Sequence, residues 1–257
     1  RWDTLADAAS PGDIAVAAAQ AGCRSVAFTY NDPVIFLEYA VDVAAACREQ
    51  GLRAVAVTAG YVEAPARAEL FGAMDAANVD LKSFDDETYR AVCLARLAPV
   101  LDTLEAIADA GRTWLEITTL LIPGLNDSVA EIEALSRWIA EHLGSAVPLH
   151  FTAFHPDYRM RDRPPTPAST LSRARAIARA YGLRYVYTGN VHDPAGQTTW
   201  CHACGERLIG RDGYRITAWC LNVDGTCQSC GAGCAGIFEE RPGEWGSRRQ
   251  PVAIGAA

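Results

Sequence analysis

The stretch Asn78-Val79-Asp80-Leu81-Lys82 alternates apolar residues with charged ones. On a β-strand, side chains two residues apart share a face, so Asp80 and Lys82 point to one side and Val79 and Leu81 to the other. An acid and a base on one face, opposite an apolar face, indicate a polar site inside a helix-covered parallel sheet. A buried structural ion pair is the alternative interpretation.

The composition is that of a folded protein without a nucleic-acid or membrane surface. The chain has 257 residues, of which 50% are hydrophobic, enough for a sizeable core. Its formal net charge of −8 argues against a nonspecific nucleic-acid binder, which usually carries a basic face. No apolar run approaches the ~18 residues of a membrane span, and the first residues do not resemble a signal peptide. We therefore expect a cytoplasmic protein with neither nucleic acid nor membrane as a partner.

Strand-like and helix-like segments alternate on both sides of the opening stretch. The expected strands are residues 25–30, 53–57, 78–82, 113–121, 149–154 and 184–188. This alternation predicts parallel strands joined by helical crossovers. We therefore expect an α/β protein with a partial (β/α), TIM-like barrel; an open doubly wound sheet is the alternative. The series begins with a helix that Ser10 and Pro11 open, so we expect a first strand upstream of Arg1.

Active sites of β/α barrels lie at the carboxyl ends of the strands, and polar residues gather at those positions in this sequence. They are Thr29, Tyr30, Asn31, Asp32, Thr58, Asp80, Lys82, Glu116, Thr118, His155 and Asn190. Plainer interpretations stay open for several of them. Asp32 would cap a helix beginning at Pro33, Lys82 would be a solvated strand end, and Glu116 would be a paired core carboxylate. His155 would be an ordinary loop histidine, and Asn190 would serve only the turn after Gly189.

Six of the nine cysteines lie between Cys201 and Cys234. Two matching Cys-x-x-Cys-Gly units, Cys201/Cys204 and Cys227/Cys230, supply the four sulfurs that tetrahedral zinc prefers, although a single iron also fits. Strand-like residues between the units favour a zinc ribbon, and a module this small needs its metal to fold. Cys234 extends the second unit to Cys-x2-Cys-x3-Cys, which leaves an iron–sulfur cluster open. Cys220 has no assigned role.

We divide the chain into three parts on these grounds. Residues 1–196 form the barrel, which lacks its first strand, and residues 197–238 form the Cys-rich zinc-ribbon or rubredoxin-like module. Residues 239–257 are rich in Gly, Pro and charge and are expected to form a disordered tail.

The combined pattern resembles the AmmeMemo-associated radical S-adenosylmethionine (radical SAM) enzymes, which are similar to pyruvate formate-lyase activating enzymes. The motifs that carry the resemblance are the terminal Cys-x-x-Cys pair and the stretches Tyr30-Asn31-Asp32-Pro33, Thr58-Ala59-Gly60-Tyr61, Asn78-Val79-Asp80-Leu81-Lys82, Ile122-Pro123-Gly124-Leu125-Asn126-Asp127, Phe154-His155-Pro156-Asp157-Tyr158 and Tyr185-Val186-Tyr187-Thr188-Gly189-Asn190.

The resemblance implies a partial barrel that binds S-adenosylmethionine and a 4Fe-4S cluster, and that abstracts hydrogen through a 5′-deoxyadenosyl radical. Its implied S-adenosylmethionine contacts are Tyr30, Asn31, Asp32, Asp80, Lys82, Thr118, His155 and Asn190. Asp32 stands where the family more often has Glu, in the turn that holds the methionine amino group. The implied partners are a flavodoxin- or ferredoxin-type electron donor and a protein substrate, either a glycyl-radical enzyme or a Memo- or AMMECR-type protein.

One departure from the family pattern bears on activity. The sequence has no Cys-x3-Cys-x2-Cys triplet, the motif that holds the radical cluster. We expect this triplet upstream of Arg1, together with the first strand, and expect the present fragment to be unable to cleave S-adenosylmethionine by itself. Two other hypotheses remain: a lyase or aldolase that uses Lys82 as a Schiff base, and a non-catalytic zinc scaffold on a degenerate barrel.

Overall fold

The computed structural model describes residues 8–243, 246–252 and 254. The chain divides into two compact units, each described by itself below. The first unit contains Arg1–Asp80, Ala98–Leu115 and Arg249–Ala257, and the second contains Leu81–Leu97 and Glu116–Arg248. The predicted division after residue 196 stays a prediction. Part of the expected disordered tail, at 244–245, 253 and 255–257, lies outside the described residues.

Within the described residues, six parallel strands follow one another across a sheet in the order β1-β2-β3-β4-β5-β6. Their bounds are β1 Ser25–Phe28, β2 Arg53–Thr58, β3 Ala76–Asp80, β4 Trp114–Leu121, β5 Leu149–Ala153 and β6 Val186–Gly189. A doubly wound sheet reverses its strand order at a switch point, and this sheet does not. The order therefore confirms the predicted α/β barrel-type fold.

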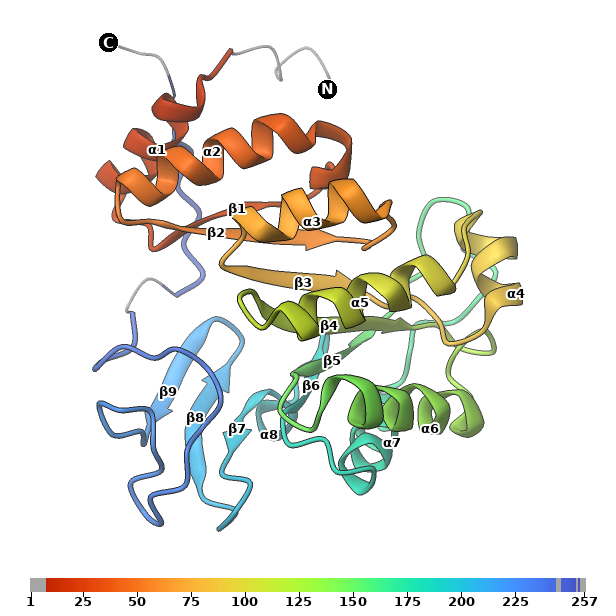
Figure 1. Ribbon diagram of the computed structural model, residues 1–257. Coiled ribbons are helices and arrows are strands. Elements are labelled where there is room, and N and C mark those ends of the chain that lie inside the picture. The colour runs from red at the N-terminus through yellow and green to blue at the C-terminus, as the bar shows by residue number, and fades with distance from the viewer. Residues whose placement is uncertain (1–7, 244–245, 253, 255–257) are drawn as a thin grey trace. The chain divides into compact units, whose positions relative to one another are not determined.

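In the first unit, helices cover one face of the strands (Figure 1). They are α1 Pro11–Gln20, the 3₁₀ turn η2 Pro33–Phe36, α2 Leu37–Glu49, α3 Ala64–Ala73 and α5 Ala98–Ala110. The predicted start of α1 is confirmed: the Ser10 hydroxyl accepts the backbone N–H of Asp13, and the Asp13 carboxylate accepts the backbone N–H of Ser10. This reciprocal pair satisfies two N–H groups that a helix start otherwise leaves without partners.

The second unit holds the other helices and a small antiparallel sheet. Its helical segments are α4 Asp86–Thr88, η3 Tyr89–Cys93, α6 Val129–Trp138, η4 Ile139–Leu143, α7 Ala168–Ala180 and α8 Pro194–Gln197. The sheet has the order β7-β8-β9, with bounds β7 Thr199–Trp200, β8 Arg207–Asp212 and β9 Arg215–Trp219. β8 and β9 correspond to the strands expected between the two cysteine units, whereas β7 precedes the first unit and was not expected. None of the described helices combines the length and apolar character that a membrane span needs.

The predicted strand at 78–82 needs a correction, because β3 ends at Asp80 and Lys82 lies beyond it. The backbone N–H of Lys82 donates to the Tyr89 hydroxyl at 3.0 Å, and its carbonyl accepts from the Asn126 side chain at 2.7 Å. The backbone of Lys82 is thus hydrogen-bonded by the side chains of Tyr89 and Asn126. The burial alternation nevertheless continues past the strand, with Leu81 fully buried and Lys82 half-buried.

The core of the small antiparallel sheet continues into the residue that precedes β6. Tyr185 is 3% exposed and packs with Cys201, Leu208, Ile209, Leu221, Cys227 and Cys234. Its hydroxyl accepts the backbone N–H of Ala235 at 2.9 Å. Burial raises the pKa of Tyr185 to about 12, so the phenol stays neutral at physiological pH. The cysteine module therefore shares its apolar core with the second unit's large sheet.

Gly60, which follows β2, offers a test of the first unit's packing. An added Cβ would lie 2.7 Å from Val79 Cγ1, and the residue has φ +67°. Gly51 has a similar φ of +72° but open space around the added atom. We expect Gly60→Ala to lower the free energy of unfolding by about 2–5 kcal/mol, because a positive φ costs about 1–2 kcal/mol and overpacking about 1–3 kcal/mol. Gly51→Ala should cost only about 1–2 kcal/mol. Equal losses in urea denaturation of the two variants would contradict the close approach.

Candidate functional site

Asp32 ties the carboxyl ends of β1 and β2 together in the first unit. Its Oδ1 accepts from Val34 N–H at 3.1 Å and from the Thr58 hydroxyl at 2.8 Å, and its Oδ2 accepts from Ala59 N–H at 2.8 Å. The bond to Val34 confirms the plainer interpretation of Asp32 as a cap, in this case of η2. Because an ionised carboxylate offers about four acceptor positions, three bonds leave roughly one for a ligand. Capping and ligand binding are therefore compatible.

The residues just before Asp32 are presented to solvent. Tyr30 is 100% exposed and has φ +65°, and Asn31 is exposed beside it. A left-handed backbone costs a non-glycine residue roughly 1–2 kcal/mol, and such strain is common at ligand-binding turns. The bonds of Asp32 fix the chain immediately after the strained residue.

Asp80 is the last residue of β3 and is half-buried. Ala77 and Val79, on either side of Asn78, are buried, so Asn78 and Asp80 share the other face of the strand. This arrangement confirms the face predicted for Asp80 from the alternating pattern. Its role in binding a ligand remains a prediction.

Lys82 is the single lysine in a sequence with 23 basic residues. All the other basic residues are arginines, so a lysine ammonium occurs at one position only. Lysine is a compact point charge on a flexible stem, and arginine does not reproduce its geometry. This compositional signal was available in the sequence, and our sequence analysis missed it.

Asn126 holds the backbone of Lys82 in place, and the sequence motif that contains it gave no role to this residue. It is 3% exposed. Its Nδ2 donates to the carbonyls of Lys82 and Leu120 at 2.7 and 2.8 Å, and its Oδ1 accepts from Ile122 N–H at 2.7 Å. The side chain thus joins the chain after β3 to the carboxyl end of β4.

The remaining predicted ligand residues lie along β4 to β6 in the second unit. Thr118 is half-buried within β4, and His155 is exposed just after β5. Asn190 follows β6 with φ +58°, and its Nδ2 donates to the Ala153 carbonyl at 3.2 Å. Asn190 therefore serves the turn after Gly189, and its side chain joins the end of β6 to the end of β5.

One polar pair in this unit was only half predicted. His150 Nε2 lies 2.7 Å from Glu116 Oε2, and the imidazole stacks on the Tyr187 ring with centroids 5.1 Å apart. The alternative interpretation of Glu116 as a paired carboxylate agrees with this contact, although its side chain is 34% exposed and does not lie in the core. His150 gave no local signal, because only the register of β4 and β5 brings it to Glu116.

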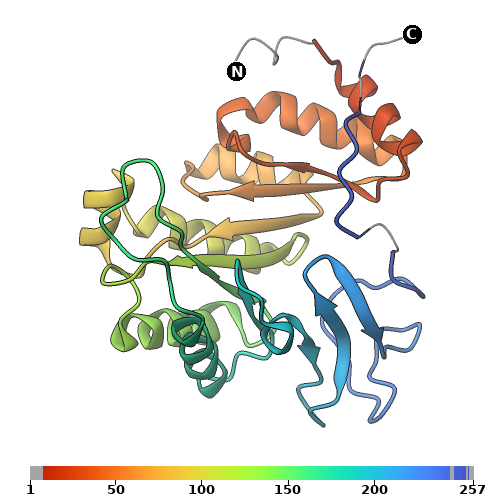
Figure 2. The same cartoon turned by 180° about the vertical axis from the view of Figure 1, so that it is seen from behind.

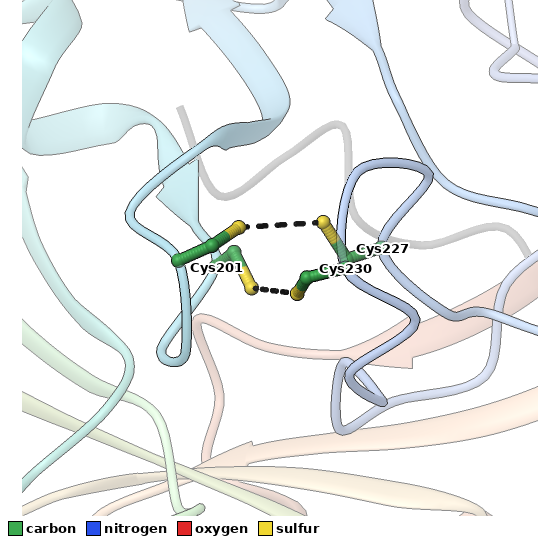
Figure 3. A group of neighbouring side chains, drawn as sticks. Cys201, Cys227 and Cys230 are labelled. Carbon is green, nitrogen blue, oxygen red and sulfur yellow. Dashed lines mark hydrogen bonds between the residues drawn. The ribbon is translucent and has the colours of Figure 1, made fainter.

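The four predicted metal ligands converge in the cysteine module. The Sγ atoms of Cys201, Cys204, Cys227 and Cys230 all lie within 4.8 Å of one another. Figure 3 shows the sulfurs of the three labelled cysteines pointing toward a common centre. The Sγ–Sγ distances are 3.6 Å for Cys201–Cys230 and 3.8 Å for Cys204–Cys227. A tetrahedral ion with metal–sulfur bonds of about 2.3 Å places its ligands about 3.8 Å apart. The sulfur set fits a single ion.

Both cysteine units have the same backbone turn. Gly205 N–H donates to the Cys201 carbonyl at 3.0 Å, and Gly231 N–H donates to the Cys227 carbonyl at 2.8 Å. The two glycines have φ +77° and +75°, a conformation that glycine adopts without strain. Burial acts to raise the pKa of Cys201, but N–H groups of Cys204 and Ala203 directed at its sulfur lower that pKa to about 7. The turn therefore favours the thiolate at Cys201, whereas burial and the neighbouring thiols raise the pKa of Cys204 to about 12.

The other cysteines do not form a second metal group among the described residues. Cys234 lies outside the group of four and is buried in the module's core, where burial raises its pKa. Cys23 and Cys93 are exposed, and Cys47 is buried. Together with the missing Cys-x3-Cys-x2-Cys motif, this shows that the described cysteines do not fit the radical 4Fe-4S cluster.

Comparison with known proteins identifies the superfamily to which the chain belongs. Residues 4–139, more than half of the chain, match the Radical SAM superfamily, so the chain belongs to this superfamily. An uncharacterized protein of Methanocaldococcus jannaschii is 38% identical over 225 residues, covering 86% of this chain and 66% of that protein. The benzylsuccinate synthase activating enzyme of Thauera aromatica is 28% identical over 131 residues, covering 51% of this chain and 39% of that enzyme. The chain thus spans about two thirds or less of these relatives.

The fold agrees with a solved relative of the same class. A domain of the pyruvate-formate lyase-activating enzyme from Bacteroides vulgatus superposes with a TM-score of 0.57 at 20% sequence identity. The match covers 65% of this chain and 99% of that domain. At this identity the likeness shows the fold alone. Superfamily membership implies S-adenosylmethionine and an iron–sulfur cluster as cofactors.

We expect the cysteine module to bind one metal ion, zinc, per chain. Cys204→Ser should remove most of the bound metal, because a hydroxyl replaces one of four thiolates. Cys93→Ser is the matched control, since Cys93 lies outside the group of four and should leave the metal content unchanged. Elemental analysis of the purified variants measures both. Equal metal content in the two variants would show that the sulfurs do not hold the ion.

Proposed function

We propose that this chain is the S-adenosylmethionine-binding part of a radical enzyme of the activating-enzyme type, which abstracts hydrogen from a protein substrate. The observation that carries the proposal is Lys82. It is the sequence's single lysine, and Asn126 and Tyr89 hold its backbone at the end of β3 in a chain of the Radical SAM superfamily. An ammonium on a stem whose backbone is held in this way suits a ligand that carries a carboxylate.

The proposed residue roles follow the charges of S-adenosylmethionine, which has an amino group, a carboxylate and a sulfonium. Asp32 accepts a hydrogen bond from the amino group through its remaining acceptor position. Lys82 pairs with the carboxylate, and Asp80 contacts the nucleoside side. Neutral hydrogen-bonding groups complete the set, as is usual in small-molecule sites. They are Tyr30, Asn31, Thr118, His155 and Asn190.

The radical step needs a group that the described cysteines do not hold. When bound, the superfamily's 4Fe-4S cluster supplies the electron that cleaves the sulfonium. The prediction that its ligands lie upstream of Arg1 stays a prediction. A flavodoxin or ferredoxin as electron donor, and a glycyl-radical enzyme or Memo- or AMMECR-type protein as substrate, belong to the same proposal. The Thauera aromatica relative, which is named as the activating enzyme of benzylsuccinate synthase, supports a protein substrate.

Lys82 permits a direct test of cofactor binding, because it is the single lysine. Reductive methylation with ¹³C-formaldehyde keeps the charge and places one side-chain NMR reporter in the chain, apart from the α-amino group. We expect the dimethyl-Lys82 signal to shift when S-adenosylmethionine is added, and Lys82→Arg, which removes the signal, to weaken binding about tenfold in calorimetry.

Two outcomes would contradict this proposal in different ways. If calorimetry detects binding while the lysine signal stays unchanged, Lys82 is not a ligand. If S-adenosylmethionine does not bind at all, the proposed function fails. Borohydride trapping of a carbonyl compound on Lys82 would instead favour the Schiff-base alternative.

The chain should bind S-adenosylmethionine without cleaving it, since its described cysteines do not fit the radical cluster. Anaerobic incubation with dithionite should release neither methionine nor 5′-deoxyadenosine, as measured by liquid chromatography and mass spectrometry. Release of both products at a constant rate would show that this chain assembles a cluster from cysteines that the structure keeps apart.

A further inference from the structure

Three side chains form a polar row across neighbouring strands of the second unit. Glu116 lies on β4, His150 on β5 and Tyr187 on β6. The carboxylate contacts the imidazole at 2.7 Å, and the imidazole stacks on the phenol ring. The proposed cofactor contacts use none of these residues.

All three residues lie on the less buried face of their strands. In β5, the flanking residues Leu149 and Phe151 are fully buried, while His150 between them is half-buried. The side chains of His150 and Glu116 keep 29% and 34% exposure. Ion pairs this exposed contribute at most about 1 kcal/mol, so stability alone is a weak reason for the pair.

The imidazole is held in one orientation. An ionised carboxylate only accepts hydrogen bonds, so Nε2 is the nitrogen that donates to Glu116; when the ring carries one proton, Nδ1 is an acceptor. Tyr187 supports one ring face and is itself fixed. Its hydroxyl lies 2.9 Å from the Thr199 hydroxyl, and the Arg211 guanidinium sits 5.6 Å above its ring. A carboxylate-oriented imidazole of this kind is the arrangement that positions an acceptor toward a ligand.

The register of the sheet places this acceptor beside a proposed cofactor residue. Thr118 on β4 is the direct strand partner of His150, and His150 is the direct partner of Tyr187. Neighbouring strands lie about 4.7–4.9 Å apart, so the side chains of direct partners on one face are adjacent. An imidazole next to Thr118 can therefore contact a molecule bound against the cofactor.

We propose that His150, oriented by Glu116 and supported by Tyr187, recognises the substrate by accepting a hydrogen bond from a substrate N–H or O–H group at Nδ1. This inference rests on the proposed function, since Thr118 is assigned to the cofactor. It adds the chemical class of the substrate group next to the reacting position: a hydrogen-bond donor, such as a peptide N–H.

The test uses the full chain and two matched probes. S-adenosylhomocysteine is added first, followed by N-acetylglycinamide, which has peptide-like N–H donors, or by N,N-dimethylacetamide, which has none. The ¹⁵N resonances of His150 are followed throughout. We expect the Nδ1 signal to shift with N-acetylglycinamide and not with N,N-dimethylacetamide.

Two variants separate recognition from structure. The amide of His150→Gln lies near the former Nε2 and removes the Nδ1 acceptor, whereas the amide of His150→Asn lies near the former Nδ1. We expect His150→Gln to weaken N-acetylglycinamide binding about tenfold, and His150→Asn to weaken it less. The midpoints of urea unfolding should stay close to that of the unaltered chain.

The outcomes are distinguishable from failure of the proposed function. If S-adenosylhomocysteine does not bind, the cofactor assignment is wrong and this inference falls with it. If it binds but the two probes act alike on His150, recognition through Nδ1 is overturned while the proposed function stands. A large fall in the urea midpoint for both variants, with unchanged probe affinity, would assign the pair to structure alone.

Discussion

Parallel strands end with backbone groups that no neighbouring strand satisfies, and this structure meets that constraint with polar side chains. Asp32 joins the ends of β1 and β2, and Asn126 joins the chain after β3 to β4. Thr166 donates to the Leu121 carbonyl at 2.6 Å and accepts from Phe154 N–H at 3.0 Å, which joins β4 to β5. An unsatisfied buried group costs about 1–3 kcal/mol. These residues therefore determine where each strand ends and in which direction the following loop continues.

The same constraint explains how the backbone of a ligand-binding residue can be held in one position although the residue lies in a loop. Lys82 lies outside β3, yet its N–H and carbonyl are both bonded, to Tyr89 and Asn126. Tyr30 keeps a strained backbone because the bonds of Asp32 hold the next turn. A residue can thus be presented by a loop and still be positioned by the sheet. Figure 2 shows the structure from behind, so that the face of the first unit's strands that α2 and α3 do not cover is turned toward the viewer.

The cysteine module extends the second unit rather than standing apart from it. Tyr185 and Tyr187 flank Val186, the first residue of β6. Tyr185 belongs to the apolar core of the module. Tyr187 contacts Thr199 through its hydroxyl and Arg211 through its ring. Metal binding, which orders small modules of this type, is therefore expected to support the strand that carries Tyr187.

Local sequence by itself determined the features that depend on neighbouring residues. The helix start at Ser10, the faces of β3 and the two cysteine turns follow from spacing and from residue types that favour one backbone. The α/β barrel class followed from the alternation of strands and helices. Tertiary structure alone decided the features that depend on register. Glu116 and His150 are 34 positions apart, and Asn126 reaches Lys82 across 44. No local pattern encodes such pairs, because a one-residue shift in strand pairing would turn each side chain to the other face of the sheet.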